Sequence, residues 1–192
     1  RRRKMMKAAD LPTYYNICDI LEHNIEPRGD KTALLSEQGC LTFREVSEQV
    51  NKVGNALIRS GVKFGECVAI LCPDRPEWVS AFFATAKIGG IALGLNTLLR
   101  IDEYDHILRD ARVKILVVHD SLLALVEPVI KKHDTLVEVI IVTDSNSTNY
   151  TTFAEWIDKE NSELDPAKTH REDFCSLHYS SGTTGMPKGV LH

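Results

Sequence analysis

Apolar runs of four to six residues recur along the middle of the chain at nearly constant spacing. They begin near Cys67, Ile91, Lys114 and Glu138, which lie 24, 23 and 24 residues apart. The intervening stretches repeat apolar residues every three or four positions, the period of an amphipathic helix. These helical stretches are Pro76–Lys87, 102–109 and 121–131. Continuous apolar strands alternating with helices predict an α/β fold, with a mostly parallel sheet and helices on both faces.

The first third of the chain predicts a helix, a hairpin and a longer helix. Segment 13–24 places apolar residues on one helical face, and the strand-like segments 32–36 and 41–43 flank a turn at Gln38-Gly39. In a capping box, a side chain at the helix start and a Glu three residues later satisfy free backbone N–H groups. Three tetrapeptides fit this pattern: Thr42-Phe43-Arg44-Glu45, Asp74-Arg75-Pro76-Glu77 and Thr152-Phe153-Ala154-Glu155.

The charge distribution argues against a nucleic-acid partner. The chain has 23 Lys and Arg against 27 Asp and Glu, a net charge of −4. Five of the basic residues lie within the first seven positions, so the remainder, with 18 basic and 27 acidic side chains, has a net charge of −9. Phosphate backbones are bound by clustered Lys and Arg. We interpret residues 1–12 as a basic N-terminal arm; no apolar stretch follows the basic residues, so a secretory signal is not expected.

Cysteine usage favours a reducing compartment. The five cysteines are scattered, odd in number and without a Cys-x-x-Cys pair. Disulfide frameworks and metal sites use paired or evenly counted ligands, so free thiols and a cytoplasmic location are expected. No run of about 18 apolar residues occurs, so no transmembrane helix is predicted.

The last 14 residues concentrate the small and hydroxyl side chains typical of a phosphate-binding loop. They read Tyr179-Ser180-Ser181-Gly182-Thr183-Thr184-Gly185-Met186-Pro187-Lys188-Gly189-Val190-Leu191-His192, and the apolar residues 174–177 predict a strand leading in. Small residues let backbone N–H groups approach an anion, hydroxyls add donors, and a lysine adds positive charge. A Walker A loop requires Gly-Lys-Ser/Thr, whereas here Pro187 precedes Lys188 and Gly189 follows it. The alternative is a plain turn, which does not require these residue types in this order.

The segment 180–189 resembles the phosphate loop of the adenylate-forming superfamily, which includes acyl-CoA synthetases, peptide-synthetase adenylation domains and firefly-type luciferases. Two weaker matches lie upstream in the expected order. Segment 41–46 resembles the family's "LTYxEL" stretch, and 86–96 resembles its second core segment, with Gly94 where the family usually has Pro. The resemblance covers 13–192, which corresponds to the N-terminal portion of the family's AMP-binding domain.

The resemblance implies a two-step ligase. A carboxylate attacks the α-phosphorus of ATP to give an acyl-adenylate and pyrophosphate, and a thiol, usually that of coenzyme A, then displaces AMP. The implied nucleotide-binding residues are Ser180, Ser181, Gly182, Thr183, Thr184, Gly185 and Lys188, with Thr184 also serving Mg²⁺. The family's ribose-binding aspartate and adenylation lysine belong to later segments. No catalytic residue is therefore assigned here, and we expect the 192-residue chain alone to be inactive.

Three hypotheses remain open: a CoA ligase, which is favoured; an adenylation module serving a carrier protein, or a luciferase-like enzyme; and a non-catalytic nucleotide-binding fragment. For the favoured hypothesis the partners are a small carboxylic acid, ATP and coenzyme A, and a homo-oligomer is left open. Segment 96–99, followed by Glu103 and Tyr104, resembles benzoate-type aryl-CoA ligases more than long-chain fatty acyl ligases; the alternative is a connection shared by many subfamilies. His178 and His192 are interpreted as strand residues beside the loop rather than as catalytic groups. The other histidines, interpreted as structural or solvated, are His23, His106, His119, His133 and His170.

Overall fold

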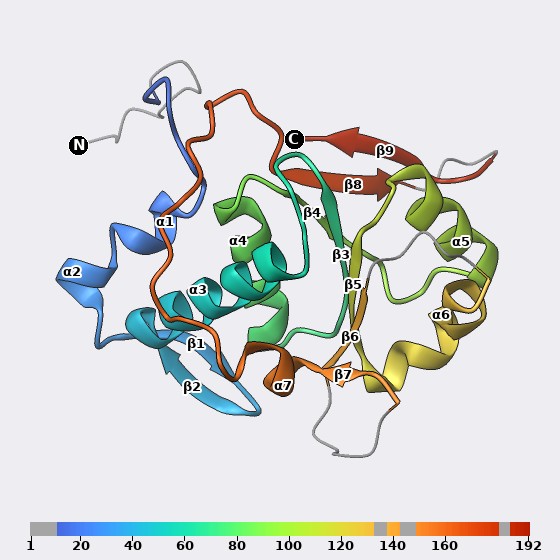
Figure 1. Ribbon diagram of the computed structural model, residues 1–192, viewed down its shortest axis with the longest axis horizontal. Coiled ribbons are helices and arrows are strands. Elements are labelled where there is room, and N and C mark those ends of the chain that lie inside the picture. The colour runs from blue at the N-terminus through green and yellow to red at the C-terminus, as the bar shows by residue number, and fades with distance from the viewer. Residues whose placement is uncertain (1–10, 133–137, 143–148, 181–184) are drawn as a thin grey trace, which may run out of the picture.

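A parallel sheet forms the centre of the molecule in the computed structural model, which describes residues 11–132, 138–142, 149–180 and 185–192. Its strands are β3 (Cys67–Leu71), β4 (Ile91–Gly94), β5 (Ile115–His119), β6 (Glu138–Val142), β7 (Thr151–Thr152), β8 (Ser176–Ser180) and β9 (Lys188–Leu191). Their order is β7-β6-β5-β3-β4-β8-β9, and among the described strands of this sheet only β9 runs antiparallel to its neighbour (Figure 1). The predicted α/β fold class is confirmed, with β3 to β6 at the four predicted positions.

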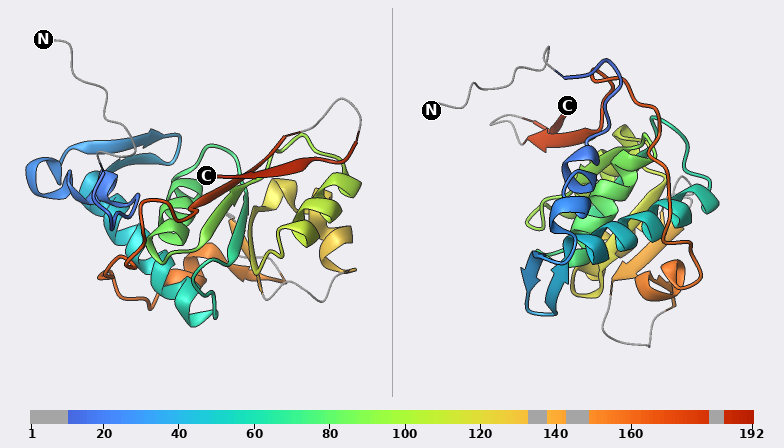
Figure 2. Two further views of the ribbon diagram at one scale, coloured as in Figure 1. Left: turned by 90° about the horizontal axis from the view of Figure 1, so that it is seen from above. Right: turned by 90° about the vertical axis from the view of Figure 1, so that its left-hand side faces the viewer.

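Helices cover both faces of this sheet (Figure 2). The helices are α3 (Phe43–Arg59), α4 (Pro76–Lys87) and α7 (Phe153–Ile157) on one face, and α5 (Ile101–Asp110) and α6 (Leu123–Ile130), preceded by a 3₁₀ turn (Asp120–Leu122), on the other. Successive strand residues point to opposite faces. Val68 and Ile70 of β3 therefore pack with α3 and α4, whereas Ala69 and Leu71 pack with α5 and α6. Burial on both faces explains why these strands are apolar at every position.

The predicted hairpin and two of the three capping boxes are confirmed. β1 (Thr32–Ser36) and β2 (Gly39–Thr42) pair antiparallel, and Gly39 has φ +122° in the turn, a conformation that favours glycine. At the start of α3, the backbone N–H of Thr42 donates to the Glu45 carboxylate at 2.8 Å, and the Thr42 hydroxyl accepts from the Glu45 N–H at 3.2 Å. The box that begins at Thr152 starts α7 in the same way.

The third predicted capping box, at residues 74–77, is wrong. The N-cap of α4 is Arg75 rather than Asp74, and no side chain caps the helix. Pro76 stands at the first helical position, where its fixed φ is already helical and its missing N–H costs nothing. The Glu77 carboxylate instead pairs with the Arg75 guanidinium at 3.2 Å. The proline therefore sets this helix start.

The predicted helix over 13–24 is wrong over its first half. The structure has only α1 (Asp19–Glu22), followed by α2 (Ile25–Arg28). The cause is Asn16, whose buried side-chain amide donates to the backbone carbonyl of Ala86 at 3.1 Å. This contact with the end of α4 fixes the preceding residues against the connector near residue 169, so they cannot continue the helix.

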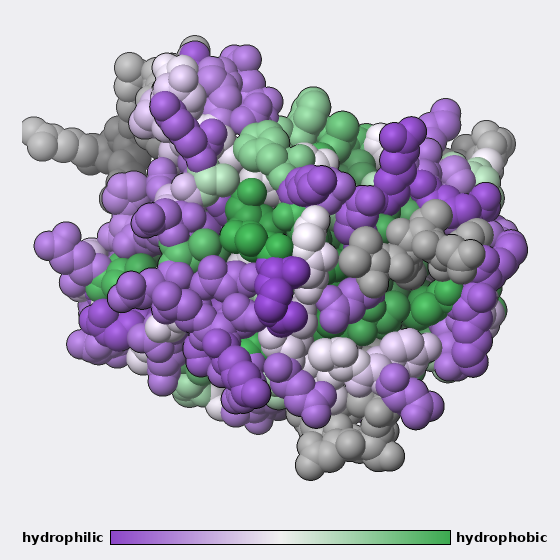
Figure 3. All heavy atoms as spheres, in the orientation of Figure 1, coloured by the Kyte–Doolittle hydropathy of each residue, from purple (hydrophilic) through white to green (hydrophobic). Residues whose placement is uncertain are grey.

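The face in Figure 3 is hydrophilic over most of its periphery, with apolar areas near its centre and over β9 and the carboxyl terminus. On β9, Val190 and Leu191 are 50% and 43% exposed. No helix within the described residues is long and apolar enough to cross a membrane. The predicted arm, residues 1–12, lies outside the described residues except for its last two positions.

Candidate nucleotide-binding site

The predicted phosphate loop connects two strands rather than a strand and a helix. β8 ends at Ser180 and β9 begins at Lys188, and these two residues face each other in the antiparallel register. The strand expected over 174–177 is confirmed but begins two residues later, at Ser176. Four of the predicted nucleotide-binding residues lie outside the described residues, namely Ser181, Gly182, Thr183 and Thr184. The Mg²⁺ assignment to Thr184 falls among them.

The three described loop residues suit an anionic ligand. Ser180, Gly185 and Lys188 are exposed. Within the described residues, the Lys188 ammonium has no hydrogen bond or ion pair, so its charge is available to a ligand. Gly185 has φ +154°, a conformation that L side chains rarely adopt, and a Cβ there would meet no described atom within 4 Å. Backbone conformation rather than space therefore requires glycine at this position.

The loop lies at the edge of the sheet where ligands usually bind. β8 follows β4 in the sheet, and both present their carboxyl ends to the same edge. The chain leaves β3 towards α4 on one face and leaves β4 towards α5 on the other. A crevice opens outside the carboxyl ends of parallel strands where successive connections take opposite faces. The predicted phosphate loop therefore borders this position.

The segment thought to indicate an aryl substrate lies beside the loop strand. Residues 96–99 directly follow β4, and the Tyr104 hydroxyl, on a fully buried residue of α5, donates to the backbone carbonyl of Asn96 at 2.7 Å. Leu98 is 87% exposed at the tip of this connection. Fold topology thus brings together two segments that the sequence separates by more than 80 residues.

Two contacts from α5 reach the base of the loop. His106 Nε2 lies 3.0 Å from the carbonyl oxygen of Pro187, and the Tyr179 hydroxyl donates to the Asp110 carboxylate at 2.5 Å. Burial and the neighbouring Asp110 carboxylate raise the pKa of Tyr179 above its ordinary value, so this hydroxyl remains a donor. The sequence interpretation of His106 as structural or solvated missed these partners. No local signal could reveal them, because the contacts join residues 81 and 69 positions apart.

The interpretation of His178 and His192 as strand residues beside the loop is confirmed. His178 lies on β8, and the His192 ring approaches it with centroids 5.4 Å apart. The His192 N–H donates to the Ser176 carbonyl at 2.9 Å, so its backbone extends the β8–β9 pairing. Both are strand neighbours, as predicted.

The described residues offer no metal-binding cluster, and two of their buried thiols stay protonated. No group of three His, Cys, Asp or Glu side chains that could hold a metal ion occurs among them. All five cysteines are described and unpaired with one another, as expected. Burial raises the pKa of Cys67 and of Cys72 to about 12, so both thiols stay protonated at neutral pH.

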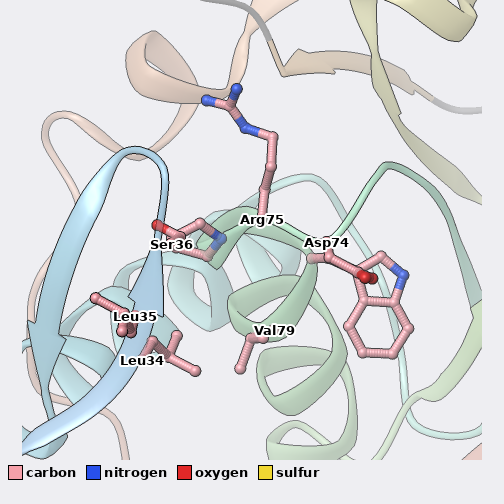
Figure 4. Close-up of a pocket in the computed structure, with 8 residues that line it drawn as sticks. Leu34, Leu35, Ser36, Asp74, Arg75 and Val79 are labelled. Atoms are coloured by element: carbon pink, nitrogen blue, oxygen red, sulfur yellow. The ribbon is translucent and has the colours of Figure 1, made fainter.

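A separate apolar cavity of about 330 Å³ lies between the β1–β2 hairpin and the start of α4 (Figure 4). Its lining consists of Leu34, Leu35, Ser36, Asp74, Arg75, Pro76, Trp78 and Val79. In Figure 4 the Arg75 side chain extends away from Leu34, Leu35 and Val79. None of the lining residues belongs to β8 or β9, so this cavity is not part of the candidate nucleotide site.

A family model described as AMP-binding enzyme matches residues 21–192. The chain belongs to this family. Two similar proteins are a benzoate–CoA ligase of Thauera aromatica, 29% identical over 96% of this chain and 35% of its own length, and a 4-hydroxybenzoate–CoA/benzoate–CoA ligase of Rhodopseudomonas palustris, 31% identical over 95% and 34%. The chain thus spans about a third of the length of these family members.

Solved structures of the family have the same fold. An anthranilate–CoA ligase, AuaEII, solved in complex with anthranoyl-AMP, is 49% identical with a TM-score of 0.94, over 97% of this chain and 36% of that chain. A benzoate–CoA ligase from Burkholderia xenovorans is 24% identical with a TM-score of 0.83, over 93% and 34%. At that identity the second likeness supports the fold alone. Both structures support the α/β fold described above.

Proposed function

We propose that this chain is the N-terminal portion, over 13–192, of an ATP-dependent carboxylate–CoA ligase. The observation that carries the proposal is the exposed Lys188 ammonium, which has no partner among the described residues. Lys188 pairs with Ser180 at the carboxyl edge of a sheet from the AMP-binding enzyme family. Such a ligase forms an acyl-adenylate and pyrophosphate, then an acyl-CoA thioester and AMP. ATP and coenzyme A as substrates agree with the cytoplasmic location expected from the free cysteines.

The assigned residues act on the charge of ATP. An unactivated carboxylate is a poor acyl donor because its leaving group would be oxide, whereas AMP leaves readily. Positive charge and hydrogen-bond donors around the polyphosphate stabilise the negative charge that develops as pyrophosphate departs. Ser180, Ser181, Gly182, Thr183, Thr184, Gly185 and Lys188 are the proposed phosphate contacts. Thr184 is also the proposed Mg²⁺ ligand, and the ion when bound would neutralise polyphosphate charge.

We propose an aromatic carboxylic acid as the substrate class. The support is the anthranilate specificity named for a structure 49% identical to this chain and the benzoate and hydroxybenzoate specificities of its relatives. Residues 96–99 follow β4, the strand that pairs with the phosphate-loop strand β8, so they can border a bound acid. Relatives also include an acetyl-coenzyme A synthetase of Xylella fastidiosa, 33% identical over 90% of this chain, so the acid requires a direct test.

The deciding experiment is acid-dependent exchange of labelled pyrophosphate into ATP by the full-length protein. The acids would be anthranilate, benzoate, hydroxybenzoates, acetate and a long-chain fatty acid. We expect exchange with an aromatic acid and AMP release on adding coenzyme A. Activation of only the fatty acid would refute the aromatic class but keep the ligase assignment. AMP release that requires a carrier-protein thiol would identify an adenylation module, and nucleotide binding without any exchange would identify a non-catalytic protein.

We also expect the isolated 192-residue chain to lack ligase activity, because the family's ribose-binding aspartate and adenylation lysine come from later segments. Turnover by the purified chain in the same exchange assay would contradict this expectation.

A further inference from the structure

We propose that α5 positions the phosphate loop for ATP, and that His106 and Asp110 are its positioning residues. The proposal rests on the function proposed above. The two residues lie four positions apart, so they project from the same face of the helix. His106 holds Pro187 and Asp110 holds Tyr179. Each held residue directly precedes one of the two proposed phosphate contacts that flank the loop, Lys188 and Ser180.

Pro187 and Tyr179, the two residues that α5 contacts, pack closely in the β8–β9 hairpin. Pro187 is buried although its neighbours Met186 and Lys188 are exposed. Tyr179 lies opposite Gly189, where a Cβ would come within 3.1 Å of the tyrosine Cζ and within 3.0 Å of Leu177 Cδ1. The tyrosine ring therefore lies against the β9 backbone, and a larger residue than glycine would have to displace these side chains.

The helix itself is firmly anchored. Tyr104, Ile107 and Leu108 are buried in the core between α5, α6 and the sheet. Tyr104 also fixes the connection after β4 through its hydrogen bond to Asn96. One rigid helix thus holds both the phosphate loop and the neighbouring segment 96–99. β9, in contrast, is exposed along its whole length and pairs with β8 alone among the described strands, so it needs this support.

A merely structural role and a positioning role predict different kinetics. Loss of an anchoring hydrogen bond should displace Lys188 and weaken ATP binding while leaving the core packed. In the full-length protein, His106→Leu should raise KM for ATP in pyrophosphate exchange about 5–10-fold, the effect of one hydrogen bond. KM for the acid should change less than twofold. His106→Gln, which keeps a donor at the same reach, should restore KM for ATP to within twofold.

Two further variants complete the test. Tyr179→Phe keeps the ring but removes the hydroxyl donor to the exposed Asp110, and should raise KM for ATP about 2–3-fold. If the His106→Leu protein does not fold, Tyr179→Phe tests the proposal by itself. Arg109→Gln is the matched control, because its side chain pairs with Asp105 on the same helix rather than with the hairpin. The proposal would be overturned if KM for ATP were unchanged in both His106→Leu and Tyr179→Phe. It would also be overturned if KM rose equally for the acid and for ATP, or if His106→Gln did not restore KM for ATP.

Hydrogen–deuterium exchange separates this proposal from the ligase assignment. In His106→Leu, amides of residues 185–192 should exchange faster than in the parent protein, while those of β5 should be unchanged. If the parent protein shows no acid-dependent pyrophosphate exchange, the ligase assignment fails and the amide measurement still decides the role of α5. Equal acceleration in β5, or none in residues 185–192, would refute positioning by this helix.

Discussion

Two lysines at opposite ends of the sheet carry the same charge in contrasting surroundings. Lys87, at the end of α4 near the amino edge, is 2% exposed; its ammonium contacts the Glu22 carboxylate and donates to Asn51 Oδ1 at 2.7 Å. Lys188, at the carboxyl edge, is exposed and has no partner for its ammonium among the described residues. The sequence alone does not distinguish the two lysines. In the structure, Lys87 is bonded within the fold, whereas Lys188 remains available to a ligand.

The difference extends beyond the two side chains. Around Lys87, Asn16 bonds the carbonyls at the end of α4, and the N–H of Ala167 donates to the Lys87 carbonyl at 2.7 Å, so this edge is closed by its own polar groups. At the carboxyl edge, Ser180 and Lys188 are left exposed on facing strands. Buried polar groups require partners within the fold, whereas exposed ones remain available for binding. This contrast supports placing the nucleotide at the carboxyl edge.

The largest expected effect comes from Lys188. Lys188→Ala in the full-length protein should slow pyrophosphate exchange about 10²–10³-fold, because it removes a charge that stabilises the departing pyrophosphate. The urea midpoint should not move, since Lys188 is exposed. A variant that exchanges pyrophosphate at the parent rate would contradict the assigned role and weaken the contrast with Lys87.

Lys87 should show the reverse pattern. Lys87→Met should lower the free energy of unfolding by about 2–3 kcal/mol, because it leaves the partly buried Glu22 carboxylate without its counter-charge. Combining it with Glu22→Gln should recover part of the loss. Urea unfolding would measure both, and KM for ATP in the folded fraction should stay unchanged. A rise in KM for ATP would show that the two edges are coupled.

A smaller effect is expected at Gly189. Gly189→Ala should destabilise the β8–β9 hairpin by about 1–2 kcal/mol, because the added methyl overlaps Leu177 and Tyr179. Val190→Ala, at the half-exposed neighbouring position, is the matched control and should cost less than about 0.5 kcal/mol. Thermal unfolding and amide exchange of residues 185–192 would compare them. Equal effects in the two variants would show that close packing on Tyr179 does not matter.

The smallest effect concerns the start of α3, the helix whose Asn51 accepts from the Lys87 ammonium. Thr42→Ala should cost about 1 kcal/mol through loss of the N-cap of α3. Hydrogen bonds from the backbone and side chain of Thr42 lower the pKa of Glu45 below its ordinary value. A carboxylate with a lowered folded-state pKa stabilises the fold above its unfolded pKa, and this contribution is lost as the pH falls through the folded pKa. The difference in urea midpoint between parent and variant should therefore narrow on acidification from pH 7 to pH 3.

Local signals account for the parts of the fold that the sequence predicted. The apolar runs that became β3 to β6 are buried on both faces, so their pattern needs no distant partner to be recognised. The Thr42 and Thr152 boxes act within four residues. The proposal of a phosphate loop likewise rests on small residues, hydroxyls and a lysine that lie close together in the chain. In each case the residues that establish the feature are neighbours in the chain.

Tertiary structure decided what depends on distant residues. Asn16 interrupts the predicted helix through carbonyls 70 and 71 positions away. His106 reaches the loop across 81 positions, and whether a lysine is buried like Lys87 or exposed like Lys188 follows from which segments cover it. The sequence by itself determined the α/β class and the central strands, because those rest on local periodicity; the phosphate loop, inferred from local composition, stays a proposal. Only the tertiary structure decided which polar groups are bonded within the fold and which remain exposed to bind a ligand, because those contacts form only after the chain has folded.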